Sequence, residues 1–222
     1  MQVKQVSENV WKLSVWMGIT ISVWLVKEED GVTLVDCGIP SMGTGILKEI
    51  EALELGPLHR ILLTHGHSDH TGALEKLRTE ASVTVFAHEK EIPYMEGKKP
   101  YPGRSKATAV AKRGTVKPLK EESDTFTAVG SLQPYYTPGH SPGHMVYYHE
   151  QDNVLIGGDL FTSFKNEKLR RPIPMFTANM GEAIKSGAIV KQLEPEILSL
   201  CHGTEIPKPH TQYDEYKEKW LS

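Results

Sequence analysis

Four side chains that commonly bind metal ions are concentrated in residues 65–70, HGHSDH. The motif directly follows a short apolar run that is typical of a buried strand. Side chains two positions apart on an extended chain point the same way, so His65 and His67 can bind one ion. A helix is predicted to begin after them and to carry Asp69 and His70 towards a neighbouring point. The spacing therefore predicts two metal ions side by side, and imidazole with carboxylate favours Zn²⁺, Mn²⁺ or Fe over Ca²⁺.

One six-residue motif cannot fill two coordination spheres, so further ligands must come from elsewhere in the chain. Three candidates follow predicted strands and lie beside glycine, which lets the backbone approach a crowded site: His140, Asp159 and His202. Together with the motif they supply five histidines and two aspartates. That set is large enough for two metal sites that share one carboxylate.

In type and in chain order, these residues resemble the metal ligands of the metallo-β-lactamase superfamily, and the resemblance covers nearly the whole chain. It implies an α/β fold, the αββα sandwich, with a dinuclear metal site at one edge. It also implies the role of each ligand: His65, His67 and His140 for the first ion, Asp69, His70 and His202 for the second, and Asp159 as the bridge. Two further residues are implied as supports that hydrogen-bond to the ligands, Asp36 in the VDCG sequence and His144.

The same residues indicate a branch of the superfamily. True β-lactamases of this fold lack the bridging aspartate, so Asp159 argues against that activity, and flavodiiron oxidoreductases have glutamate where this chain has His67. The repeated Pro-Gly-His of residues 137–144 resembles the thioesterase and lactonase branches. Quorum-lactone hydrolases often place tyrosine where this chain has Thr162, so the identity of the substrate stays open.

The resemblance implies a hydrolase in which a hydroxide bridging two metal ions attacks a small ester, thioester or lactone. Metal binding lowers the pKa of water from 15.7 to about 7, and Asp69 and Asp159 are the expected catalytic carboxylates. We expect two divalent metal ions per chain, and zinc is the expected metal, with manganese or iron as alternatives. Two other activities remain open: a mononuclear-iron dioxygenase of the persulfide type, which needs only His65, His140 and Asp159, and a phosphodiesterase or nuclease of the same fold.

The elements that must position these residues follow from the hydrophobic pattern. Runs of β-branched and aromatic residues predict strands at 10–15, 19–26, 33–35, 60–64, 83–87, 125–129, 132–137, 145–149, 154–156 and 197–201. Helical periodicity predicts helices at 44–55, 68–78 and 181–193. Strands in both halves, each half with its own helices, predict sheet layers covered by helices on the outside. No linker divides the chain, so we expect residues 1–222 to form one domain.

Residues 91–120 break this pattern, because they lack periodicity and are rich in proline and glycine. Residues 97–120 within them hold eight lysines or arginines and no acidic residue. We expect this basic segment (residues 91–120) to form neither one long helix nor an embedded strand and to border the substrate mouth, where it could act as a lid. Its charge favours anionic substrates. The alternative is a solvated loop.

The composition of the chain limits its expected binding partners and cellular location. A net charge of −3 gives no general attraction to nucleic acid, and no apolar run approaches the ~18 residues of a membrane span. The first residues lack the charged head and apolar run of a signal peptide, so we expect a cytoplasmic protein. We expect a small-molecule substrate, without nucleic acid or membrane, and a homodimer is open. Cys37 and Cys201 are predicted to be small buried residues, and His149 to face solvent.

Overall fold

The computed structural model describes residues 1–123, 125–164 and 167–221. The apolar runs of the N-terminal half pair into one seven-stranded sheet whose strands follow chain order. The first four are antiparallel: β1 (Gln2–Gln5), β2 (Val10–Trp16), β3 (Thr20–Glu28) and β4 (Gly31–Val35). Three parallel strands, which need longer connections, extend the sheet: β5 (Leu58–Leu62), β6 (Thr84–Ala87) and β7 (Val116–Pro118).

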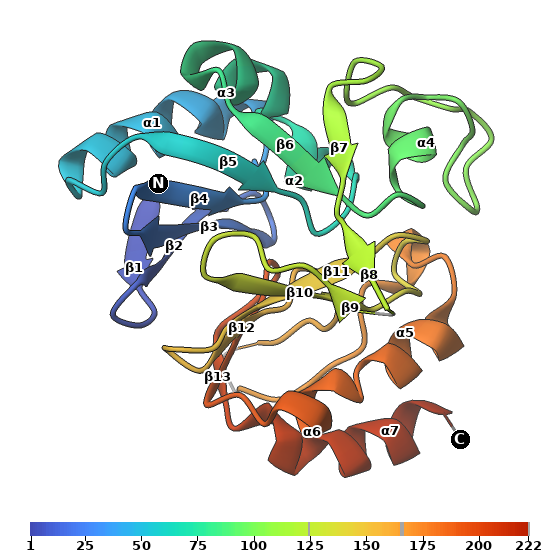
Figure 1. The fold of residues 1–222 in the computed structure, drawn as a ribbon. Coiled ribbons are helices and arrows are strands. Elements are labelled where there is room, and N and C mark those ends of the chain that lie inside the picture. The colour runs from blue at the N-terminus through green and yellow to red at the C-terminus, as the bar shows by residue number, and fades with distance from the viewer. Residues whose placement is uncertain (124, 165–166, 222) are drawn as a thin grey trace.

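A five-stranded sheet from the C-terminal half lies against the first sheet (Figure 1). Its strands also follow chain order: β10 (Leu132–Tyr136), β11 (Met145–His149), β12 (Val154–Ile156), β13 (Ile197–Ser199) and β14 (Ile206–Pro207). Within this sheet β12 and β13 pair in parallel and the other neighbours are antiparallel. A separate antiparallel pair, β8 (Glu121–Glu122) and β9 (Thr125–Phe126), precedes it in the chain.

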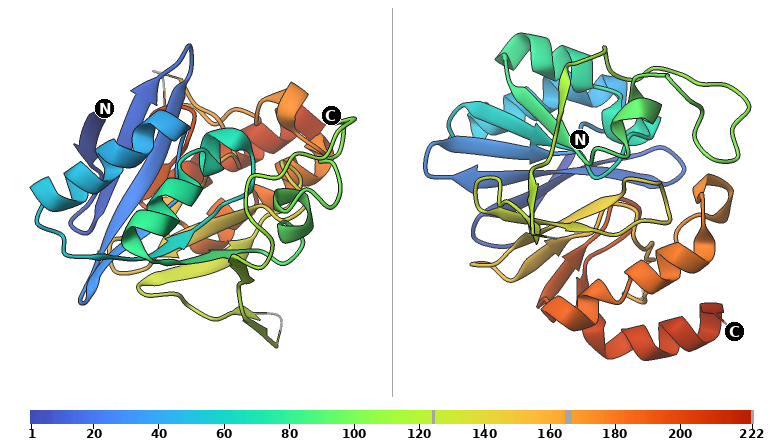
Figure 2. Two further views of the ribbon diagram at one scale, coloured as in Figure 1. Left: turned by 90° about the horizontal axis from the view of Figure 1, so that it is seen from above. Right: turned by 45° about the vertical axis from the view of Figure 1, so that its right-hand side comes forward.

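Helices cover the outer face of each sheet, so the layers run helix, sheet, sheet, helix (Figures 1 and 2). The first sheet is covered by α1 (Gly43–Ala52) and α3 (Leu74–Ala81), and the second by α5 (Met180–Ser186), α6 (Ile189–Leu193) and α7 (Tyr213–Leu221). The connections contain α2 (Ser68–Thr71), α4 (Ile92–Met95) and 3-10 turns at Pro40–Met42, Pro174–Phe176 and Pro209–Gln212. This arrangement confirms the predicted αββα sandwich. None of the helices in the described part of the chain is both long and apolar enough to cross a membrane.

Two apolar cores hold the layers together. The larger core contains residues of both sheets, including Trp24 and Tyr147, whose side chains are fully buried. The Trp24 indole N–H donates to the Ser199 hydroxyl (2.8 Å), and the Tyr147 hydroxyl donates to the Leu63 carbonyl (2.7 Å). Both hydrogen bonds run from one sheet to the other, so the buried aromatic residues also join the sheets through their polar atoms. A second core around Phe161 packs the second sheet against α5, α6 and α7.

Two of the predicted helices are each divided by a glycine. The helix predicted at 68–78 forms as α2 and α3, because the N–H of Gly72 donates to the carbonyl of Gly38 (2.7 Å) rather than continuing the helical ladder. The helix predicted at 181–193 forms as α5 and α6, with Gly187 between them. A Cβ at Gly187 would lie 2.7 Å from the Phe161 ring, so the break lets the second core approach the backbone closely.

Three local predictions are wrong. The basic segment contains β7, which pairs with β6 at the edge of the first sheet and buries Val116. The strand predicted at 125–129 ends at Phe126, because the next N–H donates to Lys120 outside the strand pair. His149 is 1% exposed, since the turn after β11 folds over it and the N–H of Asp152 donates to its Nδ1 (3.2 Å).

A buried ion pair supports the segment that follows β13. Lys12 of β2 is 4% exposed, and its ammonium group donates to the Gly203 carbonyl (2.8 Å) and pairs with Glu205 Oε1 (3.1 Å). Lys4 pairs with the other carboxylate oxygen of Glu205. Burial opposes ionisation of Glu205, but the charge of Lys12 and the hydrogen bonds from both lysines lower its pKa to about 2. Through Lys12, strand β2 therefore holds the backbone that directly follows His202.

This ion pair predicts a pH-dependent contribution to stability. The pKa of Glu205 falls from 4.5 in the unfolded chain to about 2 in the fold, so its contribution is fully present above pH 4.5 and is lost as the pH falls towards 2. Glu205→Gln should lower the free energy of unfolding by about 2–3 kcal/mol at pH 7 and by progressively less below pH 4.5. Urea denaturation at a series of pH values measures this. Glu196→Gln, at an exposed carboxylate 3.9 Å from Lys208, is the control. A Glu205→Gln deficit that stays constant with pH would contradict the assignment.

Candidate metal centre

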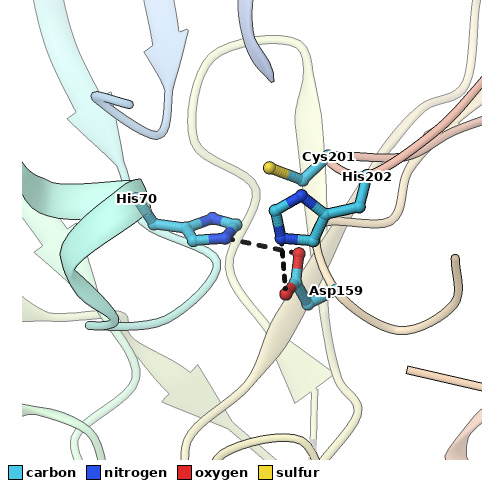
Figure 3. A group of neighbouring side chains, drawn as sticks. All are labelled: His70, Asp159, Cys201 and His202. Atoms are coloured by element: carbon cyan, nitrogen blue, oxygen red, sulfur yellow. Dashed lines mark ion pairs between the residues drawn. The ribbon is translucent and has the colours of Figure 1, made fainter. Parts of the chain in front are cut away.

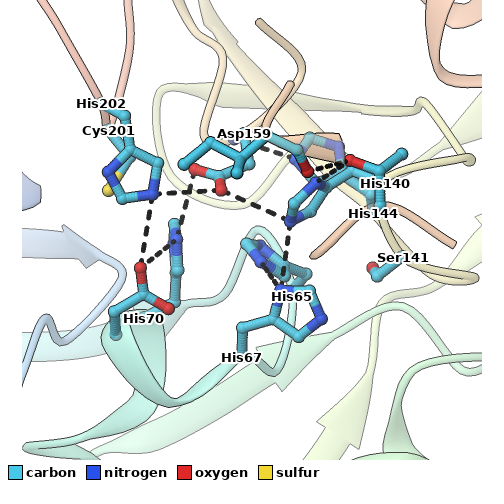
Figure 4. Close-up of polar contacts among 12 residues, drawn as sticks. His65, His67, His70, His140, Ser141, His144, Asp159, Cys201 and His202 are labelled. Atoms are coloured by element: carbon cyan, nitrogen blue, oxygen red, sulfur yellow. Dashed lines mark hydrogen bonds and ion pairs between the residues drawn. The ribbon is translucent and has the colours of Figure 1, made fainter. Parts of the chain in front are cut away.

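Three histidines from two loops bring their ring nitrogens to one point (Figure 4). His65 and His67 lie on the extended segment after β5, and His140 lies on the loop after β10. Nε2 of His65 is 2.9 Å from Nδ1 of His67, and Nε2 of His140 is 3.1 Å from that same Nδ1. The three nitrogens thus lie within 4.8 Å of one another, close enough to bind one metal ion. We call it the three-histidine group.

The three-histidine group has the protonation state that a metal requires. Burial is the main cause that holds the pKa values of His65 and His140 well below the usual range; neighbouring histidine charges lower them further, and the charge of Asp159 opposes the shift. Burial and the charge of His70 lower the pKa of His67 to about 4. Neutral imidazoles at pH 7 offer lone pairs without having to release a proton. The group is therefore suited to bind a cation near neutral pH.

A second group combines histidine with carboxylate (Figure 3). Nε2 of His202 lies 3.3 Å from Oδ2 of Asp69 and 3.2 Å from Oδ2 of Asp159. Nε2 of His70 lies 3.3 Å from Oδ1 of Asp159 and 3.8 Å from Oδ2 of Asp69. His70 and Asp69 come from α2, and Asp159 and His202 follow β12 and β13. We call this second set the mixed group.

Asp159, a member of the mixed group, also contacts the three-histidine group. Its Oδ2 is 3.3 Å from Nε2 of His140 in the three-histidine group and 3.2 Å from Nε2 of His202 in the mixed group. Burial opposes its charge, but His202, His70 and His140 hold the pKa of the carboxyl well below its usual range. One carboxylate is thus in contact with donors from both groups, which is the position that a bridging ligand requires.

Two buried atoms of the mixed group lack a hydrogen-bond partner among the described residues: Nε2 of His70 and Oδ1 of Asp159. Buried polar atoms are rarely left unsatisfied, and such exceptions call for an explanation such as a missing ion. The two atoms lie 3.3 Å apart, and both are good ligands for Zn²⁺, Mn²⁺ or Fe. The residues present therefore fit a metal ion at this position.

Asp36 orients His70 from the outer side. Its Oδ2 accepts from Nδ1 of His70 (2.7 Å) and from the Thr64 hydroxyl (2.7 Å), and its Oδ1 accepts the Thr64 N–H (2.8 Å). Nδ1 of His70 therefore carries a proton, and Nε2 is directed at Oδ1 of Asp159 (3.3 Å), which is the nitrogen that a metal ion would bind. Asp36 adopts a left-handed backbone conformation (φ 60°), a sparsely populated region for a residue other than glycine. Gly158 packs closely behind, because a Cβ there would lie 2.8 Å from the Thr64 Cβ.

His144 and Cys201 border the ligands but are engaged elsewhere. Nε2 of His144 accepts the backbone N–H of Asp159 (3.2 Å), and its Nδ1 bonds to the Thr137 hydroxyl (2.9 Å), which occupies both ring nitrogens. The thiol of Cys201 lies within 4.8 Å of the ligand atoms of His70, Asp159 and His202 (Figure 3). It is buried and hydrogen-bonded to the backbone of Ser22 on β3. The backbone of β3 also accepts from Nδ1 of His202, through the Thr20 carbonyl (2.7 Å).

Glu91 is a residue that the sequence analysis did not single out. Its carboxylate is fully buried and accepts four hydrogen bonds: from the N–H of Gly66 (2.9 Å), the Tyr101 hydroxyl (2.7 Å), the Ser141 hydroxyl (3.0 Å) and the N–H of Gly143 (2.7 Å). Gly66 lies between His65 and His67, and Ser141 follows His140. Glu91 therefore ties together the two loops that carry the three-histidine group. A single glutamate at the start of a loop gives no signal of this in the sequence.

The basic segment borders the ligands on the solvent side. The Tyr101 ring lies 4.9 Å from the His67 ring, and Arg104 and Lys106 line a hollow of about 490 Å³ that also contains Asp69, Asp159 and His202. We call it the metal-side hollow. The neighbouring lysines turn elsewhere: Lys98 pairs with Glu96 (2.6 Å), and Lys99 lies 4.3 Å from the centre of the Tyr94 ring. Two of the basic side chains thus face the ligands.

The chain is similar to several known proteins. A family model described as the metallo-beta-lactamase superfamily matches residues 17–202. "Probable metallo-hydrolase YybB" of Bacillus subtilis is 39% identical over 220 residues, which cover 97% of each chain. "Hydroxyacylglutathione hydrolase" of Bartonella henselae is 30% identical over 166 residues, covering 73% of this chain and 56% of that protein.

Solved structures share the fold at lower identity. A metallo-beta-lactamase from Pontibacter korlensis superposes with a TM-score of 0.72 at 19% identity, covering 100% of this chain and 99% of that one. A beta-lactamase domain protein from Burkholderia ambifaria gives a TM-score of 0.72 at 20% identity, covering 98% and 72%. At this identity the likeness establishes the fold alone.

The position of Glu91 predicts an effect on metal affinity without direct contact to a metal. Glu91→Gln places an amide N–H₂ opposite groups that all donate, so at least one hydrogen bond is lost and the two loops are no longer held in register. Metal affinity should fall about 10- to 100-fold, measured by competition with a chelator. Glu96→Gln is the matched control, because Glu96 is also buried in the basic segment but bonds to Gly114 and Lys98. Equal affinities in the two variants would show that Glu91 has no positioning role.

Proposed function

The chain belongs to the metallo-β-lactamase superfamily, and from this premise we propose that it is a hydrolase that binds two divalent metal ions and cleaves a small ester, thioester or lactone. The observation that carries the proposal is the contact of Asp159 with both groups of ligands: Nε2 of His140 at 3.3 Å and Nε2 of His202 at 3.2 Å. The hydrolase names of the relatives YybB and hydroxyacylglutathione hydrolase support the reaction class.

The ligand sets divide between the two proposed ions. His65, His67 and His140 would hold one ion, Asp69, His70 and His202 would hold the other, and Asp159 would contact both. Zinc is the expected metal for this mixture of imidazole and carboxylate, with manganese or iron as alternatives. When bound, such ions lower the pKa of a coordinated water to about 7 and polarise a carbonyl oxygen.

Asp69 is the carboxylate best placed to move a proton. Its side chain is 29% exposed and borders the metal-side hollow, whereas Asp159 is almost completely buried. Burial opposes ionisation of Asp69, but the charge of His70 and the hydrogen bond to His202 lower its pKa to about 2. An ionised carboxylate at the edge of the hollow can accept a proton at Oδ and deliver it to a departing alkoxide or thiolate.

The complete mixed group favours the hydrolase over the iron dioxygenase. A mononuclear dioxygenase needs only His65, His140 and Asp159, and it leaves Asp69, His70 and His202 without a role. In the structure, however, Nε2 of His70 and Nε2 of His202 each lie 3.2–3.8 Å from carboxylate oxygens of Asp69 and of Asp159. Their arrangement is accounted for by a second ion.

Metal content tests the proposal. Purified protein loaded with zinc should contain two ions per chain by elemental analysis, hydrolyse an ester, thioester or lactone, and lose that activity to a chelator. Asp159→Ala should lower the metal content and remove most activity with the circular dichroism spectrum unchanged, because the cores lie outside the ligand groups. Asp214→Ala, at an exposed carboxylate on α7, is the control. One iron per chain, with oxygen consumption on a persulfide, would establish the dioxygenase instead. Full metal content in Asp159→Ala would show that Asp159 does not bridge two ions.

The basic side chains that face the metal-side hollow predict a preference for anionic substrates. Replacing Arg104 and Lys106 with glutamine should raise KM for an anionic ester about threefold to tenfold, leave kcat nearly unchanged and weaken the dependence of kcat/KM on salt. Replacing Lys98 and Lys99 removes the same charge from the same segment, but these side chains pair with Glu96 and Tyr94, so KM should change little. Equal effects of the two double variants, or equal effects on a neutral ester, would identify the segment as a solvated loop.

A further inference from the structure

A second hollow of about 500 Å³ adjoins the metal-side hollow. The two hollows share three lining residues, Ile19, Ile173 and His202. The surface of the second hollow is mostly apolar although threonine, serine and arginine also line it, and we call it the apolar groove after its large apolar side chains (Trp16, Ile19, Phe164, Ile173 and Trp220). Its volume falls in the range of sites for small molecules, about 300–1,000 Å³. It thus reaches the metal centre at His202.

Large apolar side chains are exposed mainly around these hollows. In the groove Trp16 is 72% exposed, Phe164 60% and Ile19 41%. Met17, Met175 and Phe176 are exposed at the metal-side hollow or beside His67 and His140. Clustered apolar exposure is costly in water and marks a surface that binds something apolar. Its concentration at the metal centre, rather than over the outer helices, associates the apolar ligand with the reaction.

Two arginines among the lining residues of the groove lie on its aromatic rings. The guanidinium of Arg170 is 4.6 Å from the centre of the Phe164 ring, and that of Arg171 is 4.4 Å from the centre of the Trp220 ring. No acidic residue is found among the described residues that line it. Each guanidinium is thus already paired with an aromatic ring, and with no carboxylate in the lining the groove offers nothing that would bind a cationic group.

We propose that the apolar groove receives a hydrocarbon chain of the substrate, so that the substrate class is a medium-chain acyl or alkyl ester or thioester. The inference rests on the proposed hydrolase function and adds its specificity. An ester group at the ligands, beside His202, would extend its chain past Ile19 and Ile173 into the groove. The hydrocarbon chain of the substrate belongs either to the acyl group or to the leaving group, and in both cases the groove binds the same apolar methylene chain.

Two ester series measure the dependence on chain length. One lengthens the acyl group of a p-nitrophenyl ester from acetyl to octanoyl, and the other lengthens the alcohol of an acetate ester from methyl to octyl. In the series whose chain enters the groove, kcat/KM should rise up to about fourfold per added methylene. The series that responds identifies which side of the ester lies in the groove. A flat response in both series overturns the proposal.

Two variants connect the chain-length effect to the groove. Trp16→Ala removes one wall of the groove and should lower kcat/KM for the octanoyl or octyl substrate about tenfold. Ile173→Trp should obstruct the entrance to the groove and abolish the preference for long chains. The acetyl or methyl substrate is the internal control, and its kcat/KM should change by less than about twofold in Trp16→Ala. Equal losses on long and short substrates would overturn the proposal.

Binding without turnover separates this inference from the hydrolase function. Octanoate and octan-1-ol should bind metal-free protein in titration calorimetry, and Trp16→Ala should weaken the binding about tenfold. If no ester is hydrolysed but this binding is found, the groove stands and the proposed reaction fails. If esters are hydrolysed and neither probe binds, the groove assignment fails. A dimer in sedimentation velocity that dissociates in Trp16→Ala, with no dependence on chain length, would assign the groove to a contact between two copies.

Discussion

A buried negative charge at Asp159 is the constraint on which the rest of the site depends. Its side chain is 4% exposed, and an isolated carboxylate at that depth would lose its hydration without compensation. Compensation comes from histidines 140, 202 and 70, which approach its two oxygens from two loops and from helix α2 at 3.2–3.3 Å. The N–H of Asp159 is also occupied, by His144. The position of one carboxylate therefore determines where four loop ends of the sandwich must meet (Figure 4).

The ligands keep this arrangement because a second set of groups holds each of them from outside. Asp36 fixes the tautomer of His70, the Thr20 carbonyl orients His202, and Glu91 joins the loops of His65, His67 and His140. These supports come from strand ends or from the start of a short helix. Several hydrogen bonds in this outer set are fully buried, so a low local dielectric strengthens them and makes their loss costly.

The solvent side of the site has a different composition from the ligand side. The metal-side hollow combines carboxylates with Arg104 and Lys106, whereas the apolar groove is lined by aromatic and aliphatic side chains. The boundary between them is formed by Ile19, on the turn between β2 and β3, and by Ile173. A polar reacting centre beside an apolar surface is the usual division of a small-molecule site, in which polar groups orient the ligand and apolar surface provides affinity.

The sequence by itself was sufficient for the fold class and for the candidate ligands, because both depend on local pattern. Short runs of β-branched and aromatic residues defined strands such as β11 and β12 to the residue, and the HGHSDH motif named four candidate ligands within one loop and helix. All seven candidate side chains lie together in the structure, and their roles as ligands stay a prediction. The motif is informative because metal sites require particular side-chain chemistry, which is visible in the residue types themselves.

Only the tertiary structure decided which distant groups support those ligands and what surrounds the substrate. Glu91 looks like any loop glutamate, and its role depends on Gly66, Tyr101, Ser141 and Gly143, which are brought to it by long-range folding. The division of the basic segment into side chains that face the ligands and side chains that do not was equally invisible, as was its edge strand β7. Burial of His149 and the helix break at Gly72 had the same origin. For Glu91, for β7 and for Gly72 the deciding contact joins residues far apart in the chain, so its energy has no counterpart in local sequence pattern. For His149 the deciding contact is with Asp152 in the next turn, and its geometry exists only once the turn has folded over the ring.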